Sequence, residues 1–393
     1  MPGSYIISGA RTPIGKLSGA LASFSAAELG GFAIAAALQR AGVAPHEVEH
    51  VIMGQVLMAG QGQVPSRQAA AKAGIPMNVP SVNINKVCLS GLNSIYLADQ
   101  MIANGEADIV VAGGMESMTN APYLAMGARS GFRFGDVQLL DAIQRDGLWC
   151  AFDACLMGLG TERYAAGEIS RDAQDDLAMK SNQRAAAAIA AGRLADEIVP
   201  ISIPQRKGDP IVISNDEGVR ASTTMESLAS LKPAFDKTGT VTAGNASQIS
   251  DAGSAVVMMS KREADKRGVK PLGEFISYGM VAGPDNDSLL HQPSRSILKA
   301  LERVGKKVSD VDLFEINEAF AAVGVASMRD LGITDEIVNV NGGAIALGHP
   351  IGMSGNRLAI TLLHELRRRG GGMGAAALCG GGGQGDALIL RVS

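Results

Sequence analysis

Two stretches of this sequence follow one pattern: AIAAALQRAGVAPHEVEHVIMGQ at residues 33–55 and SILKALERVGKKVSDVDLFEINE at residues 296–318. Leu38 of the first matches Leu301 of the second, a displacement of 301 − 38 = 263 residues, and the glycine four residues later also matches. Each stretch is typical of an amphipathic helix that ends at a glycine, followed by a polar turn and an apolar strand. The chain is therefore expected to contain two similar halves.

The repeat continues at the start of a later helix in each half. CLSG at residues 88–91 matches GMSG at 352–355, a displacement of 264, and ADIVVAGGMES resembles AAALCGGGGQG as a buried strand that ends in glycines. Repeated strand–helix units predict two α/β halves, each with a mostly parallel sheet and helices on its faces. We assign residues 1–120 with 250–270 to the N-terminal half and 271–393 to the C-terminal half.

Residues 121–249 interrupt the first half and differ from it in composition. They contain surface-loop stretches such as PQRKGDPIVISNDEG, with one clear helical pattern, SRDAQDDLAMKSNQRAAAAIAAG. A long insertion of this kind is usually functional or oligomer-forming. The apolar run AGSAVVMMS that follows predicts a strand that returns to the first half.

Composition excludes several classes of protein. Of the 393 residues, 46% are hydrophobic, and 35 basic against 39 acidic residues give a net charge of −4. No Lys/Arg-rich tract is interleaved with aromatic residues, so nucleic acid is not an expected partner. No apolar run approaches the ~18 residues of a membrane span, and the opening MPGSYIISGARTP lacks the basic head of a secretory signal, so a cytoplasmic protein is expected. Four cysteines without a C-x-x-C pair make a metal site or a disulfide framework a weak interpretation.

Cys88 precedes the predicted helix LSGLNSIYLADQMIANG. Free N–H groups and the helix dipole at a helix N-terminus favour an anion, which would lower the pKa of the thiol and favour the nucleophilic thiolate. A small buried hydrophobe is the alternative interpretation, and position alone leaves the two about equal.

Three more candidate residues lie at strand ends or on a loop, and two of them are surrounded by glycines. His349 sits before a proline in NGGAIALGHPIGMSG and could act as a base toward Cys88. Cys379 ends a buried strand and faces the glycines of CGGGGQG, whose N–H groups could bind an oxyanion. A dinucleotide loop is rejected because a strand, not a helix, follows. Asn317 and Glu318 of EINEAF lie at the end of an apolar strand, a place that on its own would be an ordinary strand-end turn.

Together, NKVCLSG, NEAFA, NGGAIALGHPIGMSG and LCGGGGQG resemble the thiolase family in order and spacing, and the likeness runs from GARTPIG to the last strand. GGMESMTNAPY followed by FRFGD is most similar to its biosynthetic branch, the acetyl-CoA acetyltransferases. The resemblance implies a duplicated five-layer α/β/α/β/α fold with an inserted loop domain at 121–249 for coenzyme A binding and tetramer formation. It implies acetyl-CoA, acetoacetyl-CoA and CoA as ligands, no cofactor and no metal.

The resemblance also implies roles for the four motifs. Cys88 would accept the acyl group, and His349 would be the base that activates it. Cys379 would be the acid/base that takes a proton from the methyl group of the second acetyl-CoA. One oxyanion hole would combine His349 with a water held by Asn317, and the other the backbone N–H groups of Cys88 and Gly381.

The coenzyme A contacts implied by the resemblance are Ser247 at the pantetheine arm and Arg220 near the adenine end. Met157 and Phe320 would line the acyl pocket. One departure concerns specificity, because Leu156 stands where biosynthetic members commonly have histidine, which puts the preferred chain length in doubt.

Rival interpretations remain. One is a degradative 3-ketoacyl-CoA thiolase acting on longer chains, and another is a non-catalytic member of the fold that binds CoA or lipid. A ketoacyl synthase is less favoured, since the family resemblance would then lead us to expect a second histidine in place of Cys379. A homotetramer is expected from the loop-domain stretch NAPYLAMGARSGFRFGDVQLLDAI, with a dimer as the alternative.

Overall fold

The computed structural model describes residues 3–393, and its N-terminal half contains a sheet with the strand order β4, β3, β5, β12, β1. Helix α1 begins after Ser25, which forms a capping box with Glu28, and it ends at Gly42 in the left-handed conformation, as the sequence pattern predicts. The elements of this half are β1 (Ser4–Arg11), β2 (Gly15–Lys16), α1 (Ala26–Ala41), β3 (His50–Gly54), α2 (Pro65–Lys72), β4 (Ser81–Ile84), α3 (Ser90–Ala103), β5 (Ile109–Ser117), β12 (Ser250–Ser260) and α7 (Lys261–Arg267).

The C-terminal half repeats this arrangement with the strand order β14, β15, β16, β13. Strand β15 begins 372 − 109 = 263 residues after β5, and α11 begins 354 − 90 = 264 residues after α3, so the predicted duplication is confirmed. The elements are β13 (Gly273–Ala282), α8 (Gln292–Glu302), β14 (Leu313–Ile316), α9 (Ala321–Leu331), α10 (Ala344–Leu347), α11 (Ser354–Arg368), β15 (Gly372–Gly380) and β16 (Gln384–Val392).

The prediction of mostly parallel sheets is wrong. Strand β3 runs parallel to β4 and β5, and β14 runs parallel to β15, but the pairs that involve β1, β12, β13 and β16 are antiparallel. The connection between β15 and β16 shows why, because a turn of three residues, 381–383, can join only antiparallel neighbours. Each half is therefore a mixed sheet.

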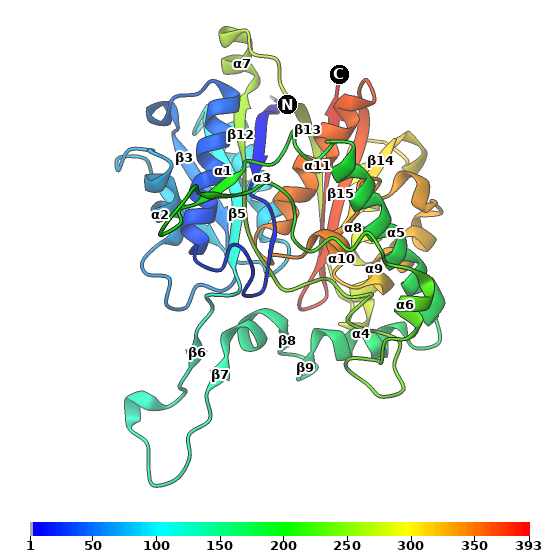
Figure 1. The fold of residues 1–393 in the computed structure, drawn as a ribbon. Helices are drawn as coiled ribbons and strands as arrows, with labels where there is room; N and C mark the ends of the chain where they lie inside the picture. The colour runs from blue at the N-terminus through cyan, green and yellow to red at the C-terminus, as the bar shows by residue number, and fades with distance from the viewer. Residues whose placement is uncertain (1–2) are drawn as a thin grey trace.

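The elements stack in five layers, as predicted (Figure 1). Helix α1 packs on β1, β5 and β12, while α3 covers the opposite face of that sheet and contacts α11. Helix α11 packs on β14 and β15, and α8 covers the far face of the second sheet. The two sheets meet edge to edge where β1 pairs with β13 through Tyr5 and Ile6. One of the two largest apolar clusters lies in the middle layer, around α3 and α11, and the other lies between α1 and the first sheet.

Glycines bring the starts of α3 and α11 into backbone contact. A Cβ atom on Gly91 would lie 2.9 Å from the backbone nitrogen of Asn356 and from the carbonyl oxygens of Gly352 and Met353. Its counterpart Gly355 would place a Cβ 2.5 Å from the nitrogen of Leu92. Only residues without a side chain allow this approach, which places the two helix N-termini at one point of the molecule.

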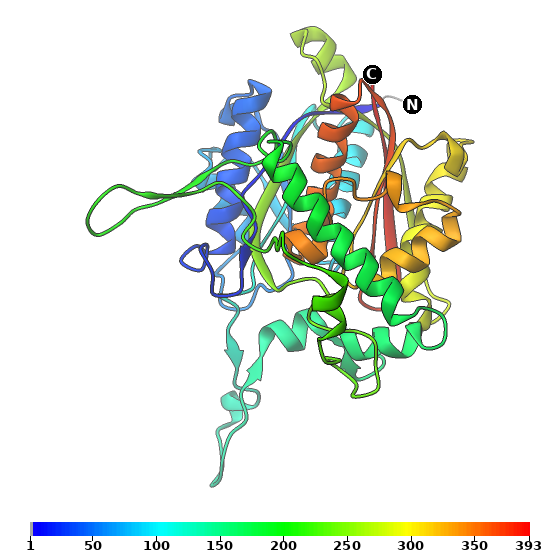
Figure 2. The same ribbon diagram turned by 45° about the vertical axis from the view of Figure 1, so that its right-hand side comes forward.

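The inserted segment extends over one end of both sheets. The β6–β7 hairpin projects away from the body (Figure 1), and the green hairpin of β10 and β11 projects from another side (Figure 2). Helix α5 packs on α9 and α10 of the C-terminal half. The elements are β6 (Tyr123–Leu124), β7 (Leu140–Asp141), a π-helical turn (Ile143–Leu148), β8 (Trp149–Cys150), β9 (Cys155–Leu156), α4 (Met157–Ala165), α5 (Arg171–Ala190), β10 (Ile201–Ile203), β11 (Ile211–Ile213) and α6 (Met225–Ala229).

Strand β12 lies between β1 and β5, so the chain returns to the first sheet after the insertion, as the sequence predicts. The exact domain boundaries stay predictions. Within residues 3–393, no helix combines the length and the apolar character that crossing a membrane requires.

Candidate active site

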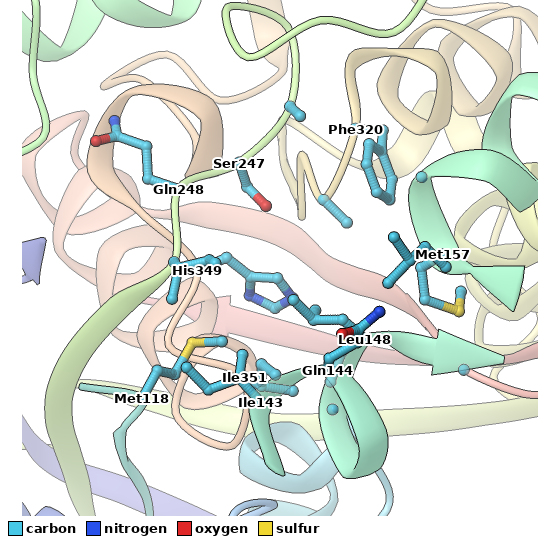
Figure 3. Close-up of a pocket in the computed structure, with 18 of the residues that line it drawn as sticks. Met118, Ile143, Gln144, Leu148, Met157, Ser247, Gln248, Phe320, His349 and Ile351 are labelled. Carbon is cyan, nitrogen blue, oxygen red and sulfur yellow. The ribbon is translucent and has the colours of Figure 1, made fainter. Parts of the chain in front are cut away.

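A cavity of about 570 Å³ lies beside the starts of α3 and α11, with the inserted segment forming part of its wall. In Figure 3, His349 projects into its centre between the side chains of Ser247, Ile351 and Leu148. Seven of the nine predicted site residues line this cavity, namely Cys88, His349, Cys379, Gly381, Met157, Ser247 and Phe320. Tertiary folding therefore brings together residues that are up to 381 − 88 = 293 positions apart.

Cys88 sits on a tight turn two residues before α3. Val87 has a φ of +52°, a left-handed conformation that is strained for a β-branched residue. The hydroxyl of Ser90 holds the turn, because it accepts from the N–H of Lys86 (2.8 Å) and donates to the carbonyl oxygen of Val87 (2.7 Å). Lys86 is in turn anchored to buried Asp386 at 2.7 Å, across the two halves. The turn that presents the thiol is thus fixed from several sides.

The Cys88 thiol is protonated in the resting protein, contrary to the thiolate expected from its place before a helix. Cys88 is half-buried, and desolvation by the surrounding protein raises the pKa of its thiol to about 12, an effect that nearby Glu116 increases. The backbone N–H groups of Cys88 and Gly381 act in the opposite direction, because they face the sulfur. Desolvation of the charged form outweighs these donors. A base is therefore needed to generate the nucleophile.

His349 has the geometry of that base. Ser354 donates its hydroxyl hydrogen to the carbonyl oxygen of Pro350 (2.9 Å), so its oxygen accepts from Nδ1–H of His349 at 2.6 Å. This assignment leaves Nε2 without a proton, and the side-chain amide of Asn317 lies 3.4 Å from it. The basic nitrogen is therefore the one beside Asn317.

Burial and the positive charge of Arg357 lower the pKa of His349 to about 4. The imidazole is thus neutral across the physiological range and stays available as a proton acceptor. Since the thiol is also neutral, the resting site holds an uncharged thiol and an uncharged imidazole. A proton moves from one to the other only when reaction with a substrate stabilises the charges that form.

Cys379 lies at the end of β15, as the sequence predicts, and the strand β16 follows the glycine turn. Burial raises the pKa of its thiol, and the nearby Cys88 raises it further. The turn places the N–H of Gly381 toward the sulfur of Cys88. The two thiols therefore face one reaction volume, and either charge disfavours the other.

Asn317 follows β14 and is fully buried next to His349. Within residues 3–393, its Oδ1 atom has no hydrogen-bond partner, which is unusual for a buried amide. An oxygen in this position can accept a hydrogen bond from a small ligand such as water. The following Glu318 differs, because it is satisfied by Ser181 and Asn339 and has a structural role.

The predicted coenzyme A contacts divide into two groups. Ser247 and Phe320 lie on paired segments, since the N–H of Ser247 donates to the carbonyl oxygen of Ala319 at 3.0 Å. Met157 begins α4, and the preceding Leu156 also lines the cavity. Arg220 is exposed and does not line the cavity, so its role at the adenine end stays a prediction.

Several residues of the cavity carry no signal in the sequence. Met118 and Ile351 form one wall with the π-helical turn, which adds Ile143, Gln144 and Leu148 (Figure 3). Nothing in DAIQRDGLW predicts a wall, because these side chains are brought there by an irregular turn. The serine of GHPIGMSG, which orients His349, could have been found from its place at the start of a helix.

Two family models match the chain. The model described as "Thiolase, N-terminal domain" covers residues 4–262, and "Thiolase, C-terminal domain" covers residues 269–392. The chain is 57% identical over 392 residues to a "Probable acetyl-CoA acetyltransferase" of Mycobacterium leprae (strain TN), with all of both chains covered. It is 51% identical over 387 residues to an "Acetyl-CoA acetyltransferase" of Cupriavidus necator, with 98% of each chain covered. On these grounds and on the geometry of the cavity, the chain belongs to the thiolase family.

Proposed function

We propose that this chain is an acetyl-CoA acetyltransferase, which joins two molecules of acetyl-CoA into acetoacetyl-CoA and CoA and also catalyses the reverse reaction. The observation that carries the proposal is the single cavity in which Cys88, His349 and Cys379 meet. Relatives of this name match over the full length of the chain. The reaction requires an acyl holder, a base for a weak C–H acid and donors for two oxyanions.

The first half-reaction acetylates Cys88. As the sulfur attacks the thioester carbonyl, His349 takes its proton on Nε2, and the carbonyl oxygen becomes an oxyanion. The C–S bond to coenzyme A then breaks, and Cys379 gives its proton to the departing thiolate. Free CoA leaves, and the site holds S-acetyl-Cys88, an imidazolium and a Cys379 thiolate.

The second half-reaction forms the carbon–carbon bond. The Cys379 thiolate removes a proton from the methyl group of a second acetyl-CoA, and the resulting carbanion attacks the carbonyl carbon of S-acetyl-Cys88. The bond between carbon and the Cys88 sulfur breaks, and the imidazolium of His349 returns its proton to that sulfur. Acetoacetyl-CoA leaves, and all three side chains are back in their resting protonation states.

Two sets of donors support the proposed oxyanions. The N–H groups of Cys88 and Gly381 converge near the reactive sulfur. His349 and Asn317 form the second set, in which His349 donates from Nε2 once it holds the proton of Cys88 and Asn317 acts through a water, as in the family resemblance. The first set is fixed before substrate binds, so little reorganisation is needed as charge develops there.

A second candidate is cleavage of longer 3-ketoacyl-CoA substrates, and Leu156 is the observation that favours it. Its side chain gives the cavity an apolar surface beside Met157. Initial rates with acetoacetyl-CoA and 3-ketooctanoyl-CoA separate the two candidates, since the same residues act on both.

We also propose a cytoplasmic homotetramer. Supporting this, the β6–β7 hairpin exposes several large apolar side chains, namely Tyr123, Met126, Phe132, Phe134 and Leu139. Light scattering of wild type should give a tetramer mass, and Phe134→Asp should give a dimer, because a charge would be buried in the contact. A dimer mass for wild type would overturn the proposal.

Intact-protein mass after brief incubation with acetyl-CoA tests the enzymatic proposal. Wild type should gain one acetyl group and lose it on addition of CoA, whereas Cys88→Ser should form no such thioester. If wild type gained no adduct, the non-catalytic binding protein would become the better interpretation.

A further inference from the structure

Glu116 occupies the position of Cys379 in the other half of the duplication, because 379 − 263 = 116. It lies on β5 next to the end of the strand, as Cys379 does on β15, and its side chain is fully buried. No step of the proposed reaction uses this carboxyl group. A charged group at such a position is expensive to bury and calls for a physical reason.

Three backbone N–H groups from two separate segments converge on this carboxyl group. Its Oε2 atom accepts from Val56 and from Gly352, each at 3.0 Å, and its Oε1 atom accepts from Leu57 at 3.1 Å. Val56 and Leu57 follow β3, whereas Gly352 belongs to the loop that carries His349. Glu116 thus ties a segment of the N-terminal half to the loop of the catalytic base.

Gly352 is the counterpart of Cys88 in the duplication, since 352 − 264 = 88. A Cβ atom there would lie 2.7 Å from the Cα of Gln55 and 2.9 Å from Oε2 of Glu116. The loop therefore rests directly on the carboxylate and on the backbone after β3. Cys88 and Val87 pack on the same cluster, formed by Val56, Leu57, Met118 and Ile351.

Hydrogen-bond chemistry favours the ionised form of Glu116 in this arrangement. All three partners are donors, and a protonated carboxyl group would have to direct its own hydrogen at one of them. Burial opposes ionisation and raises the pKa of Glu116 to about 7, an effect that Asp251 on β12 increases. The other titratable group that faces it is the thiol of Cys88, while the turn after β3 contributes only uncharged side chains.

We propose that ionised Glu116 is a positioning residue for Cys88 acylation, which holds the His349 loop in register with the turn that carries Cys88. The inference rests on the proposed acetyltransferase function. Glu116 touches no reacting atom and acts through Gly352, three residues after His349; this positioning outweighs the opposing effect of its charge, which raises the pKa of the Cys88 thiol. A misplacement of about 1 Å between reacting groups can cost roughly 100-fold in rate, so losing this tie should affect turnover more than substrate binding.

The test measures the rate of Cys88 acetylation from pH 6 to pH 8, together with kcat and KM for acetyl-CoA. Glu116→Gln should lower the acetylation rate and kcat about 10- to 100-fold and leave KM within about twofold. For wild type, the acetylation rate should rise with pH through an inflection near 7, because protonation of Glu116 weakens its hydrogen bond to the loop of His349. Glu116→Gln should lack this inflection, since neither His349 nor Cys88 titrates in that window.

Two further variants keep the test decisive. Glu116→Asp retains the charge with a shorter reach, so it should be slower than wild type but keep an inflection. Asp99→Asn removes another buried carboxylate, which accepts from Ser4 at 2.6 Å, and should behave as wild type. Thermal unfolding of each variant identifies any that does not fold, and the wild-type and Glu116→Asp profiles then carry the test.

Some results would overturn the inference. These are a wild-type rate in Glu116→Gln, an unchanged inflection in that variant, a flat wild-type profile, or loss of the inflection in Asp99→Asn. A wild-type protein that gains no acetyl group would instead refute the proposed function. Normal acetylation of wild type with an unaltered Glu116→Gln profile would refute only the role of Glu116.

Discussion

Replacing Gly91 with alanine tests the close contact between the two halves, because two physical effects oppose each other there. In a helix, alanine is favoured over glycine by about 1 kcal/mol, so propensity alone predicts a more stable protein. The new Cβ, however, would lie 2.9 Å from three backbone atoms of residues 352, 353 and 356. Ordinary contact begins at 3.4 Å, so these atoms must retreat by 3.4 − 2.9 = 0.5 Å.

The steric effect should win. Backbone atoms of two segments cannot rotate away as a side-chain end can, and overpacking of this kind costs about 1–3 kcal/mol. We expect Gly91→Ala to lower the free energy of unfolding by about 1–2 kcal/mol after the propensity gain is included. Acetylation of Cys88 should fall about tenfold or more, because the displaced carbonyl oxygens of residues 352 and 353 belong to the loop of His349 and Cys88 lies three residues before Gly91.

Denaturant unfolding and the single-turnover rate of acetylation measure the two quantities. The matched control is Gly324→Ala within α9, whose Cβ would meet only a side-chain end of Leu177 closer than 4.0 Å. That side chain can rotate, so the control should be close to neutral in both assays. A Gly91→Ala protein that is more stable than wild type and equally active would refute the argument from backbone contact.

Further expectations concern specificity, pH and buried charge. Leu156→His should lower activity on 3-ketooctanoyl-CoA relative to acetoacetyl-CoA by about 10-fold or more, measured as a ratio of kcat/KM, because a polar group replaces an apolar cavity wall. The pKa of His349 in the folded protein is about 4, below its unfolded value, so its contribution to stability is present above about pH 6.5 and is lost as pH falls through about 4. Urea unfolding at pH 7 and at pH 4.5 should therefore show a smaller decrease in the free energy of unfolding for His349→Gln than for wild type. Arg11→Leu should lower the free energy of unfolding by about 3–5 kcal/mol, because Arg11 is fully buried and pairs with Asp216 at 2.6 Å. Lys72 forms an exposed ion pair with Glu28, so Lys72→Ala should lower the same quantity by at most about 1 kcal/mol.

The repeat in the sequence predicted the architecture well. Helix α1 ends at Gly42, as the pattern predicts, whereas α8 ends at Glu302 and Gly305 closes the turn after it; the strands β3 and β14 that follow lie where the periodicity places them. Strand direction was the exception, and the reason is physical. Apolar runs such as the strands before and after Gly381 look the same whether a strand is parallel or antiparallel to its neighbour, and only the length of the connection distinguishes them.

The chemistry of the site was predicted only in part. Residue types and their places at strand and helix ends pointed to Cys88, His349 and Cys379. The protonation states of these residues could not be predicted from the sequence. Cys88 lies just before a helix N-terminus, which favours the thiolate, but burial favours the neutral thiol, and burial depends on the whole fold. The role of Glu116 was also hidden, since its neighbours in the chain carry no sign of the three N–H groups that converge on it.

By itself, the sequence determined the duplication, the order of helices and strands, and the side chains able to do chemistry, because these depend on short-range periodicity and on residue type. Tertiary structure alone decided the pairing of β1 with β12 and β13, the neutral resting pair of thiol and imidazole, the tautomer of His349 and the contact between α3 and α11. These properties depend on burial and on distances between residues hundreds of positions apart, which local patterns in the chain do not encode.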